Sequence, residues 1–165
     1  MRKIWIALLM IAPWMFAQTG NCNEVSGAIL SNFLDEQGTI MINGTSVNFY
    51  ATTLGTATGD LRGAIGVYAL SQLAPGQPVQ VHHHWVTEAG DTIFLQDASA
   101  STFPIPNAPV IATANYVVHI NGGTGRFAGA NGFIKFFGGI DVSDPANPRG
   151  ILRYLGNISF AQSQQ

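Results

Sequence analysis

The stretch from Asn115 to Phe137, NYVVHINGGTGRFAGANGFIKFF, is the part of this chain that most constrains its fold. An apolar run, Tyr116 to Ile120, leads into five glycines within eleven residues, and a second apolar run, Phe133 to Phe137, follows directly. Glycine accepts positive φ and close backbone approach, so such a cluster suits a tight and irregular connection. The stretch therefore predicts two β-strands joined by a compact glycine-rich turn.

The rest of the chain has the same organisation on both sides of this stretch. Turn signals such as Asn43-Gly44 and Pro75-Gly76-Gln77-Pro78 recur, and short runs rich in Val, Ile, Thr, Tyr and Phe lie between them. This spacing is typical of an all-β sandwich or barrel. The expected strands cover residues 25–34, 39–42, 47–54, 61–73, 79–88, 92–102, 110–120, 133–137 and 151–160.

The glycine cluster also carries a family resemblance. Gly122 to Phe127, GGTGRF, followed by Ala128-Gly129-Ala130-Asn131-Gly132, resembles the signature of the allene oxide cyclase and dirigent barrel superfamily, especially its small secreted bacterial members. The similarity runs roughly from Val81 to Phe160. It implies an eight-stranded antiparallel barrel, often trimeric, with an apolar lumen. Nine expected strands are one too many for such a barrel, and 25–34 is the weakest of them.

The composition and the first seventeen residues together indicate one exported domain. The apolar fraction is 47% and the charged fraction only 10%, against about 25% in an ordinary soluble chain. Arg2 and Lys3 precede the apolar run Ile4 to Phe16, and Ala17 is suited to cleavage, so residues 1–17 are predicted to be a signal peptide. Residues 18–165 would then form the barrel domain of a secreted or periplasmic protein, with no membrane attachment after cleavage. The single cysteine, Cys22, cannot form an internal disulfide.

Charge and strand pattern bear on the partners. The predicted mature chain keeps 5 basic residues against 9 acidic ones, a balance that gives no support for nucleic-acid binding. Several runs, such as Ile111 to Ile120, are apolar on both faces, which suggests that the outside of the barrel is also covered. We therefore expect a homo-oligomer, for which the resemblance implies a trimer.

The histidines supply the candidate chemistry. His82, His83 and His84 fall in the run VQVHHHWVTE, and His82, His84 and Glu88 share one face of that strand. If Ala89-Gly90 forms a two-residue turn, His82 lies opposite Asp97 on the next strand. A one-residue slip would remove this pairing, and the pattern leaves open whether that face is inside or outside the barrel.

An interior histidine beside a carboxylate would have a tuned pKa and could move a proton at neutral pH. His82, His84 and Asp97 are therefore the candidate catalytic residues. Such proton movement is all that enolisation, cyclisation or isomerisation requires, so no cofactor or metal is expected. An interior His satisfied by Asp97 without a catalytic role is the alternative, as is a merely polar outer surface.

Three further residues complete the candidate site: Glu88, His119 and Tyr116, as ligand-binding side chains. His119 shares a face with Val117, whereas Tyr116, Val118 and Ile120 occupy the opposite face. Arg126, within the glycine loop, is expected to bond loop carbonyls or a surface acid rather than a ligand.

Three functions are compatible with these features. The first is a barrel that binds a small apolar molecule in its lumen; the resemblance implies either cofactor-free isomerisation or cyclisation, or guidance of a reactive intermediate made by another enzyme. The catalytic residues of neither family map onto this chain. The second is a cupin-type enzyme with a metal on His82, His84 and Glu88, although the later glycine and second half of the cupin motif are missing. The third is a structural or interaction barrel with a filled interior.

Overall fold

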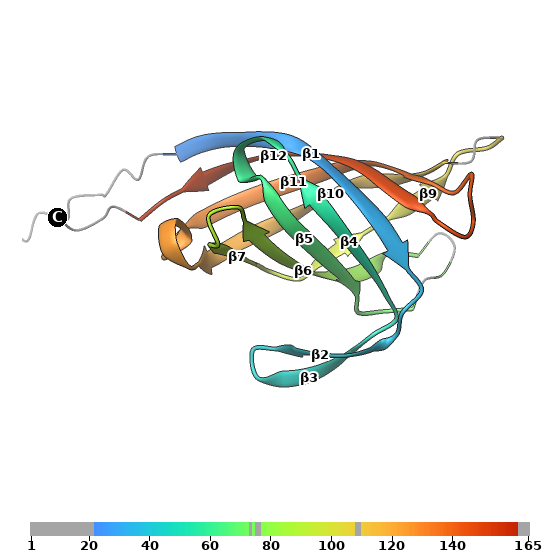
Figure 1. Cartoon of the computed structure of the whole chain (residues 1–165), viewed down its shortest axis with the longest axis horizontal. Coiled ribbons are helices and arrows are strands. Elements are labelled where there is room, and N and C mark those ends of the chain that lie inside the picture. The colour runs from blue at the N-terminus through green and yellow to red at the C-terminus, as the bar shows by residue number, and fades with distance from the viewer. Residues whose placement is uncertain (1–21, 73, 75–76, 108–109, 162–165) are drawn as a thin grey trace, which may run out of the picture.

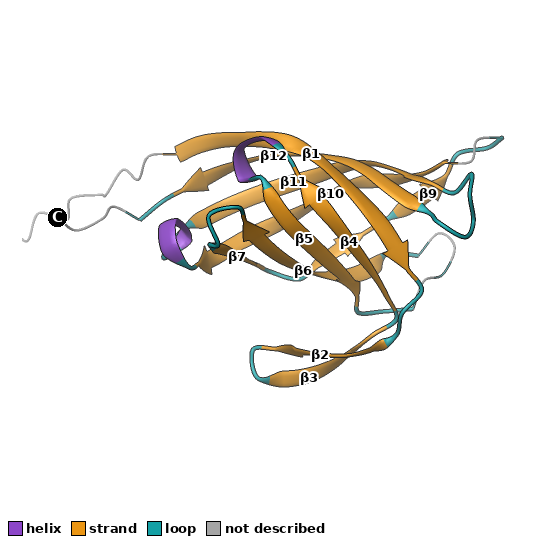
Figure 2. Cartoon of the chain, in the orientation of Figure 1, coloured by secondary structure: helices purple, strands orange, loops and turns teal. Residues whose placement is uncertain are grey.

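The computed structural model describes residues 22–161 except 73, 75–76 and 108–109, and this part of the chain is all-β (Figures 1 and 2). The predicted signal peptide at 1–17 and the predicted mature start at Gln18 lie outside the described residues. The elements are β1 (Cys22–Leu34), β2 (Gly38–Ile42), β3 (Thr45–Phe49), β4 (Ala51–Ala57), η1 (Gly59–Leu61), β5 (Gly63–Ala69), β6 (Val79–Thr87), β7 (Thr92–Leu95), β8 (Ala98–Ala100), β9 (Thr102–Pro104), β10 (Val110–Gly123), η2 (Gly125–Phe127), β11 (Asn131–Asp141) and β12 (Arg149–Ser159).

Eight of these strands close into an antiparallel barrel. The order around the ring is β1, β4, β5, β6, β7, β10, β11 and β12, and β12 pairs with β1 to close it. The short strands β8 and β9 add to β6 and β10. The predicted fold class, a single eight-stranded antiparallel barrel, is confirmed.

The surplus strand is not the one that the sequence suggested. Residues 25–34 lie in β1, which pairs with both β12 and β4 and is part of the ring. The predicted run 47–54 is instead two strands, β3 and β4, and β3 pairs with β2 in a separate hairpin. Asn43 and Gly44, both at positive φ, form its turn. This hairpin leaves one end of the barrel and folds back along its outside (Figure 1).

The other end of the barrel is plugged. The two 3₁₀ turns, η1 and η2, lie at this end, and their residues Leu61 and Phe127 are fully buried (Figure 2). Trp85, also fully buried, donates its indole N–H to the carbonyl oxygen of Leu61 at 2.9 Å. The hydroxyl of Tyr154 donates to the carbonyl of Thr58 at 2.7 Å and accepts from the amide of Leu61 at 2.9 Å. These three hydrogen bonds tie η1 to β6 and β12 and satisfy the buried polar groups of Trp85 and Tyr154.

The glycine-rich stretch forms the predicted connection, with η2 between β10 and β11. Gly132, at the start of β11, has φ 139°, and a Cβ there would collide with the carbonyl oxygen of Asn157 in β12. Glycine is thus required for β11 to approach β12 closely enough to complete their ladder.

Candidate functional site

Strand β6 divides the histidines between the two faces of the barrel wall. Trp85 and His83 point inward and are 0% and 2% exposed, whereas His82 and His84 lie on the outer face. The alternation follows from the two-residue period of a strand, with the plug residue Trp85 setting which row faces the core. The row with His82 and His84 is therefore outside the lumen.

The turn after β6 is one residue longer than predicted, and this shifts the pairing of β6 with β7 by one residue. Trp85 pairs with Ile93 and His84 with Phe94, so the register is one residue away from the prediction. Thr87 and Asp91 close the turn, because the amide of Thr87 donates to the carbonyl of Asp91 at 2.8 Å. The turn thus holds three residues rather than two, and a slip of one residue exchanges the partners of every side chain.

His82 and Asp97 nevertheless meet. Nδ1 of His82 lies 2.6 Å from Oδ1 of Asp97, and the His82 side chain is only 12% exposed. The regular pairing of β7 ends at Leu95, and the irregular segment after it brings Asp97 beside His82. The ring of His84 stands edge-on to that of His82, with centroids 4.9 Å apart. The three predicted catalytic residues are thus neighbours on the outer face.

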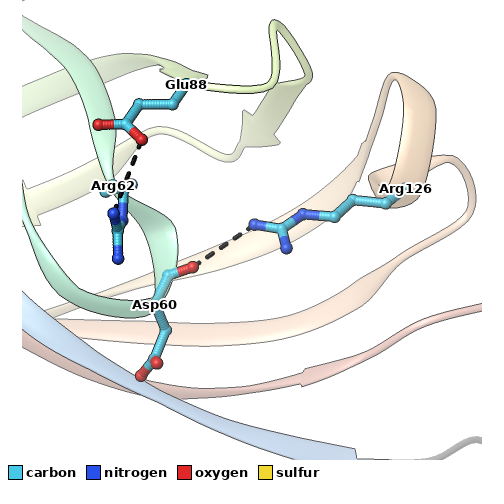
Figure 3. A network of polar contacts seen from close by, with 4 residues as sticks. All are labelled: Asp60, Arg62, Glu88 and Arg126. Atoms are coloured by element: carbon cyan, nitrogen blue, oxygen red, sulfur yellow. Dashed lines mark hydrogen bonds and ion pairs between the residues drawn. The ribbon is translucent and has the colours of Figure 1, made fainter.

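The structure separates the remaining predicted residues from that group. Glu88 lies in the turn at the plugged end, where its carboxylate is 3.9 Å from the guanidinium of Arg62 (Figure 3). His119 is exposed on the outer face of β10, and Tyr116 is buried on its inner face, as their alternation predicted. Arg126 donates to the backbone carbonyl of Asp60 at 3.5 Å, which confirms the structural role expected for it (Figure 3).

The cupin arrangement is not assembled. Glu88 lies beyond the end of β6, in the turn, and its carboxylate is paired with Arg62. Across the described residues, no three His, Cys, Asp or Glu side chains are grouped so as to hold a metal ion.

The polar group that the sequence did not single out is inside the barrel. Nε2 of His83 lies 3.0 Å from the hydroxyl of Tyr116, and both rings stack on Phe136 with centroids 5.2 Å apart. Nδ1 of His83 is buried and has no hydrogen-bond partner among the described residues. Only the register of β6 reveals this residue, because His82, His83 and His84 are alike in sequence.

Burial keeps both members of this pair uncharged. Desolvation, followed by repulsion from His82 and His84, lowers the pKa of His83 to about 3. Desolvation also raises the pKa of the Tyr116 hydroxyl well above its ordinary value. At neutral pH the interior therefore contains a neutral imidazole and a neutral phenol.

Three inward-facing residues near His83 are less deeply buried than the rest of the core. Val67 pairs with His83, and Thr53 pairs with Val67, so all three side chains lie on the inward face. Val67 and Thr53 are nevertheless only partly buried, as is Leu152, two positions along β12 from the inward-facing Tyr154. Val67 and Leu152 pack against the buried core, and Ala69 and Val81, which lie farther from the plug than His83, are themselves buried.

Among the described residues, no helix is long and apolar enough to cross a membrane. No family model matches the chain, and neither the curated proteins nor the solved structures include a match to it.

Proposed function

We propose that the protein binds a small, uncharged and mostly apolar molecule in its lumen, beside Val67 and Leu152, with His83 and Tyr116 as its polar anchor. One observation carries the proposal: the buried Nδ1 of His83, which lacks a partner in the described part of the chain. An unsatisfied buried polar atom costs about 1–3 kcal/mol, and a ligand that supplies the missing hydrogen bond would recover that energy.

The expected ligand follows from the lining. The anchor is neutral, and the inward-facing neighbours Val67, Thr53 and Leu152 are apolar or weakly polar. If the Tyr116 hydroxyl donates to Nε2, the proton of the neutral imidazole is on Nδ1, which is then a free donor. If Nε2 donates to the hydroxyl instead, Nδ1 is a free acceptor. A ligand with one carbonyl or hydroxyl group on an apolar body fits either state. Few polar groups that fix the orientation of an apolar ligand are typical of small-molecule sites.

The proposal also covers export of the protein and a reaction of the bound molecule. The leader pattern at residues 1–17 supports secretion or a periplasmic location. Nδ1 of His83, in an apolar surrounding, would orient a bound molecule through one hydrogen bond, and a molecule held in this way could undergo cofactor-free isomerisation or cyclisation. If another enzyme makes the ligand as a reactive intermediate, the barrel would only orient it.

Blocking the lumen is expected to abolish binding. The neutral fluorophore N-phenyl-1-naphthylamine should bind the chain beginning at Gln18 with saturable fluorescence enhancement. Val67→Trp adds a large ring to the inward face and should weaken binding by roughly tenfold or more, an effect of about 1.4 kcal/mol or greater. Val117→Trp introduces the same ring on the outer face of β10, where Val117 is 42% exposed, and should bind as the wild type does.

Either of two outcomes would reject lumen binding: no enhancement by the wild-type barrel, or equal affinity in the Val67 and Val117 variants. Thermal unfolding followed by circular dichroism establishes that both variants are folded. Val67→Phe is the fallback if the larger ring prevents folding.

The outer face supports a second proposal, that copies of this chain associate. Leu30 and Ile151 are directly paired on β1 and β12 and are 62% and 58% exposed, and Leu155 extends the patch. Glu24 and Arg153 project from the same outer face of these two strands. A face that carries both signs beside an apolar centre is complementary to itself, which favours a second copy as its occupant.

Native mass spectrometry at micromolar concentration is expected to give a multiple of the monomer mass. Leu30→Lys should dissociate the assembly, because it places an unpaired charge in the contact. Phe103→Lys changes an equally exposed residue on β9, 55% exposed, and should leave the assembly intact. A wild-type monomer would rule out the proposed association.

A further inference from the structure

The β2–β3 hairpin forms one wall of a groove outside the barrel. The groove, of about 600 Å³, lies between the hairpin tip and the outer face of β6 and β7. Met41 and Asn43 line it from the hairpin, and His82, Val86, Phe94 and Asp97 line it from the barrel. Residues of the hairpin and residues of the barrel both line the groove, so it has a wall on each side.

Aromatic contacts hold the hairpin in this place. Phe49 of β3 packs edge-on against Tyr68 of β5 with ring centroids 5.2 Å apart, and Tyr68 packs against His84 at 5.3 Å. His84 in turn contacts His82. Edge-to-face pairs at such distances are favourable, so a continuous row of rings links the root of the hairpin to the floor of the groove.

Apolar surface is left uncovered in the groove. Met41 is 63% exposed, Phe94 49% and Val86 42%, although all three face one cavity. Large apolar side chains gathered around a hollow are typical of a ligand site rather than of scattered surface residues.

The His82–Asp97 pair determines what hydrogen bond the groove offers. A carboxylate can only accept, so the 2.6 Å contact requires Nδ1 of His82 to donate to Asp97. In the neutral imidazole the other nitrogen, Nε2, is then an acceptor. If Nε2 takes up a proton, the adjacent carboxylate balances the new positive charge.

The charges of the residues that line the groove narrow the class of ligand that it can bind. The described lining contains no Lys or Arg, and its one acidic residue, Asp97, is already engaged by His82. A permanently anionic or cationic ligand therefore has no counter-charge here. A neutral molecule whose O–H can be given up to Nε2 matches the lining best, with its ring or chain against Met41, Val86 and Phe94.

We propose that this groove binds a phenol or enol and that His82, held by Asp97, accepts the proton of its hydroxyl group. The O–H bond of the ligand breaks as the N–H bond at Nε2 forms, which leaves a phenolate or enolate beside an imidazolium paired with Asp97. No other reactant is required. This site is separate from the lumen and does not depend on the ligand proposed there.

Titration with 4-nitrophenol tests the site, because the absorbance of the dye reports whether it is ionised. At a pH where the free dye is mostly protonated, the wild-type protein should bind it and raise the ionised fraction. His82→Gln removes the basic nitrogen, because an amide cannot take up the proton, and should weaken binding roughly tenfold or more, since a hydrogen bond to a charged group contributes about 1.5–3 kcal/mol. Asp97→Asn should leave the bound dye largely protonated.

Matched variants separate the groove from other surfaces. His119→Gln removes an exposed histidine outside the groove and should bind the dye as the wild type does. Phe94→Ala should weaken binding, whereas Phe103→Ala, at similar exposure on β9, should not. The proposal is overturned if the dye does not bind, if His82→Gln binds equally well, or if Val67→Trp rather than Phe94→Ala removes binding, which would place the dye in the lumen.

Discussion

Replacing Gly132 by alanine is expected to lower the free energy of unfolding by about 3 kcal/mol or more, and in a marginally stable barrel to prevent folding. The added Cβ collides with the carbonyl oxygen of Asn157, a backbone atom of the neighbouring strand that cannot rotate away. Overpacking of this kind typically costs about 1–3 kcal/mol, and alanine at a positive φ adds further strain. Urea denaturation followed by circular dichroism measures the loss.

Gly44→Ala provides the matched control. Gly44 also has a positive φ, 79°, but no atom lies within 4 Å of the position that its Cβ would take. Its substitution should cost only the conformational term, about 1 kcal/mol. Equal losses at the two positions would mean that close strand approach at Gly132 does not matter.

Acid is expected to destabilise the protein through His83. In the unfolded chain this histidine takes up a proton near pH 6.5, whereas in the folded barrel burial lowers its pKa to about 3. Between these values the unfolded state binds more protons, so stability is full above pH 6.5 and is lost as the pH falls toward 3. At pH 4 the loss from this one group is about 3 kcal/mol relative to pH 7.

Urea denaturation at pH 7, 5 and 4 checks this prediction with two variants. The double variant His83→Phe with Tyr116→Phe removes the titrating group and its partner together, so no polar atom is orphaned. It should lose about 3 kcal/mol less than the wild type between pH 7 and 4. Tyr116→Phe alone keeps His83 and should retain the wild-type pH dependence at a lower overall stability. Parallel stability curves for the wild type and the double variant would contradict the assignment.

The fold was predictable because its determinants are local. Short β-rich runs between turn signals indicate an all-β ring, and the glycines from Gly122 to Gly132 mark where two of its strands connect. The departure of β2 and β3 from the ring was not predictable in the same way. Their residues alternate like those of a barrel strand, and the Asn43-Gly44 turn says that they pair with each other but not where the pair lies.

The site was predictable only in part, because it depends on the length of the turn between β6 and β7. The sequence predicted the His82–Asp97 contact through a two-residue turn that the structure does not have, and the segment after Leu95 makes the contact instead. Alternation along the strand correctly separated Tyr116 from His119. Which row of β6 faces the lumen is a tertiary property, decided by Trp85 packing into the plug. Since three adjacent histidines look equivalent in sequence, the interior residue, His83, could not be distinguished from its neighbours.

The position of the chain ends in the barrel has a practical consequence for handling the protein. Cys22, at the start of β1, pairs with Ser159 at the end of β12, and both strands reach the plugged end (Figure 1). A resin, sensor chip or fused carrier attached through the thiol of Cys22 would therefore sit at the plugged end of the barrel. Immobilised in this way, every molecule would turn the opposite end of the barrel toward the flowing sample.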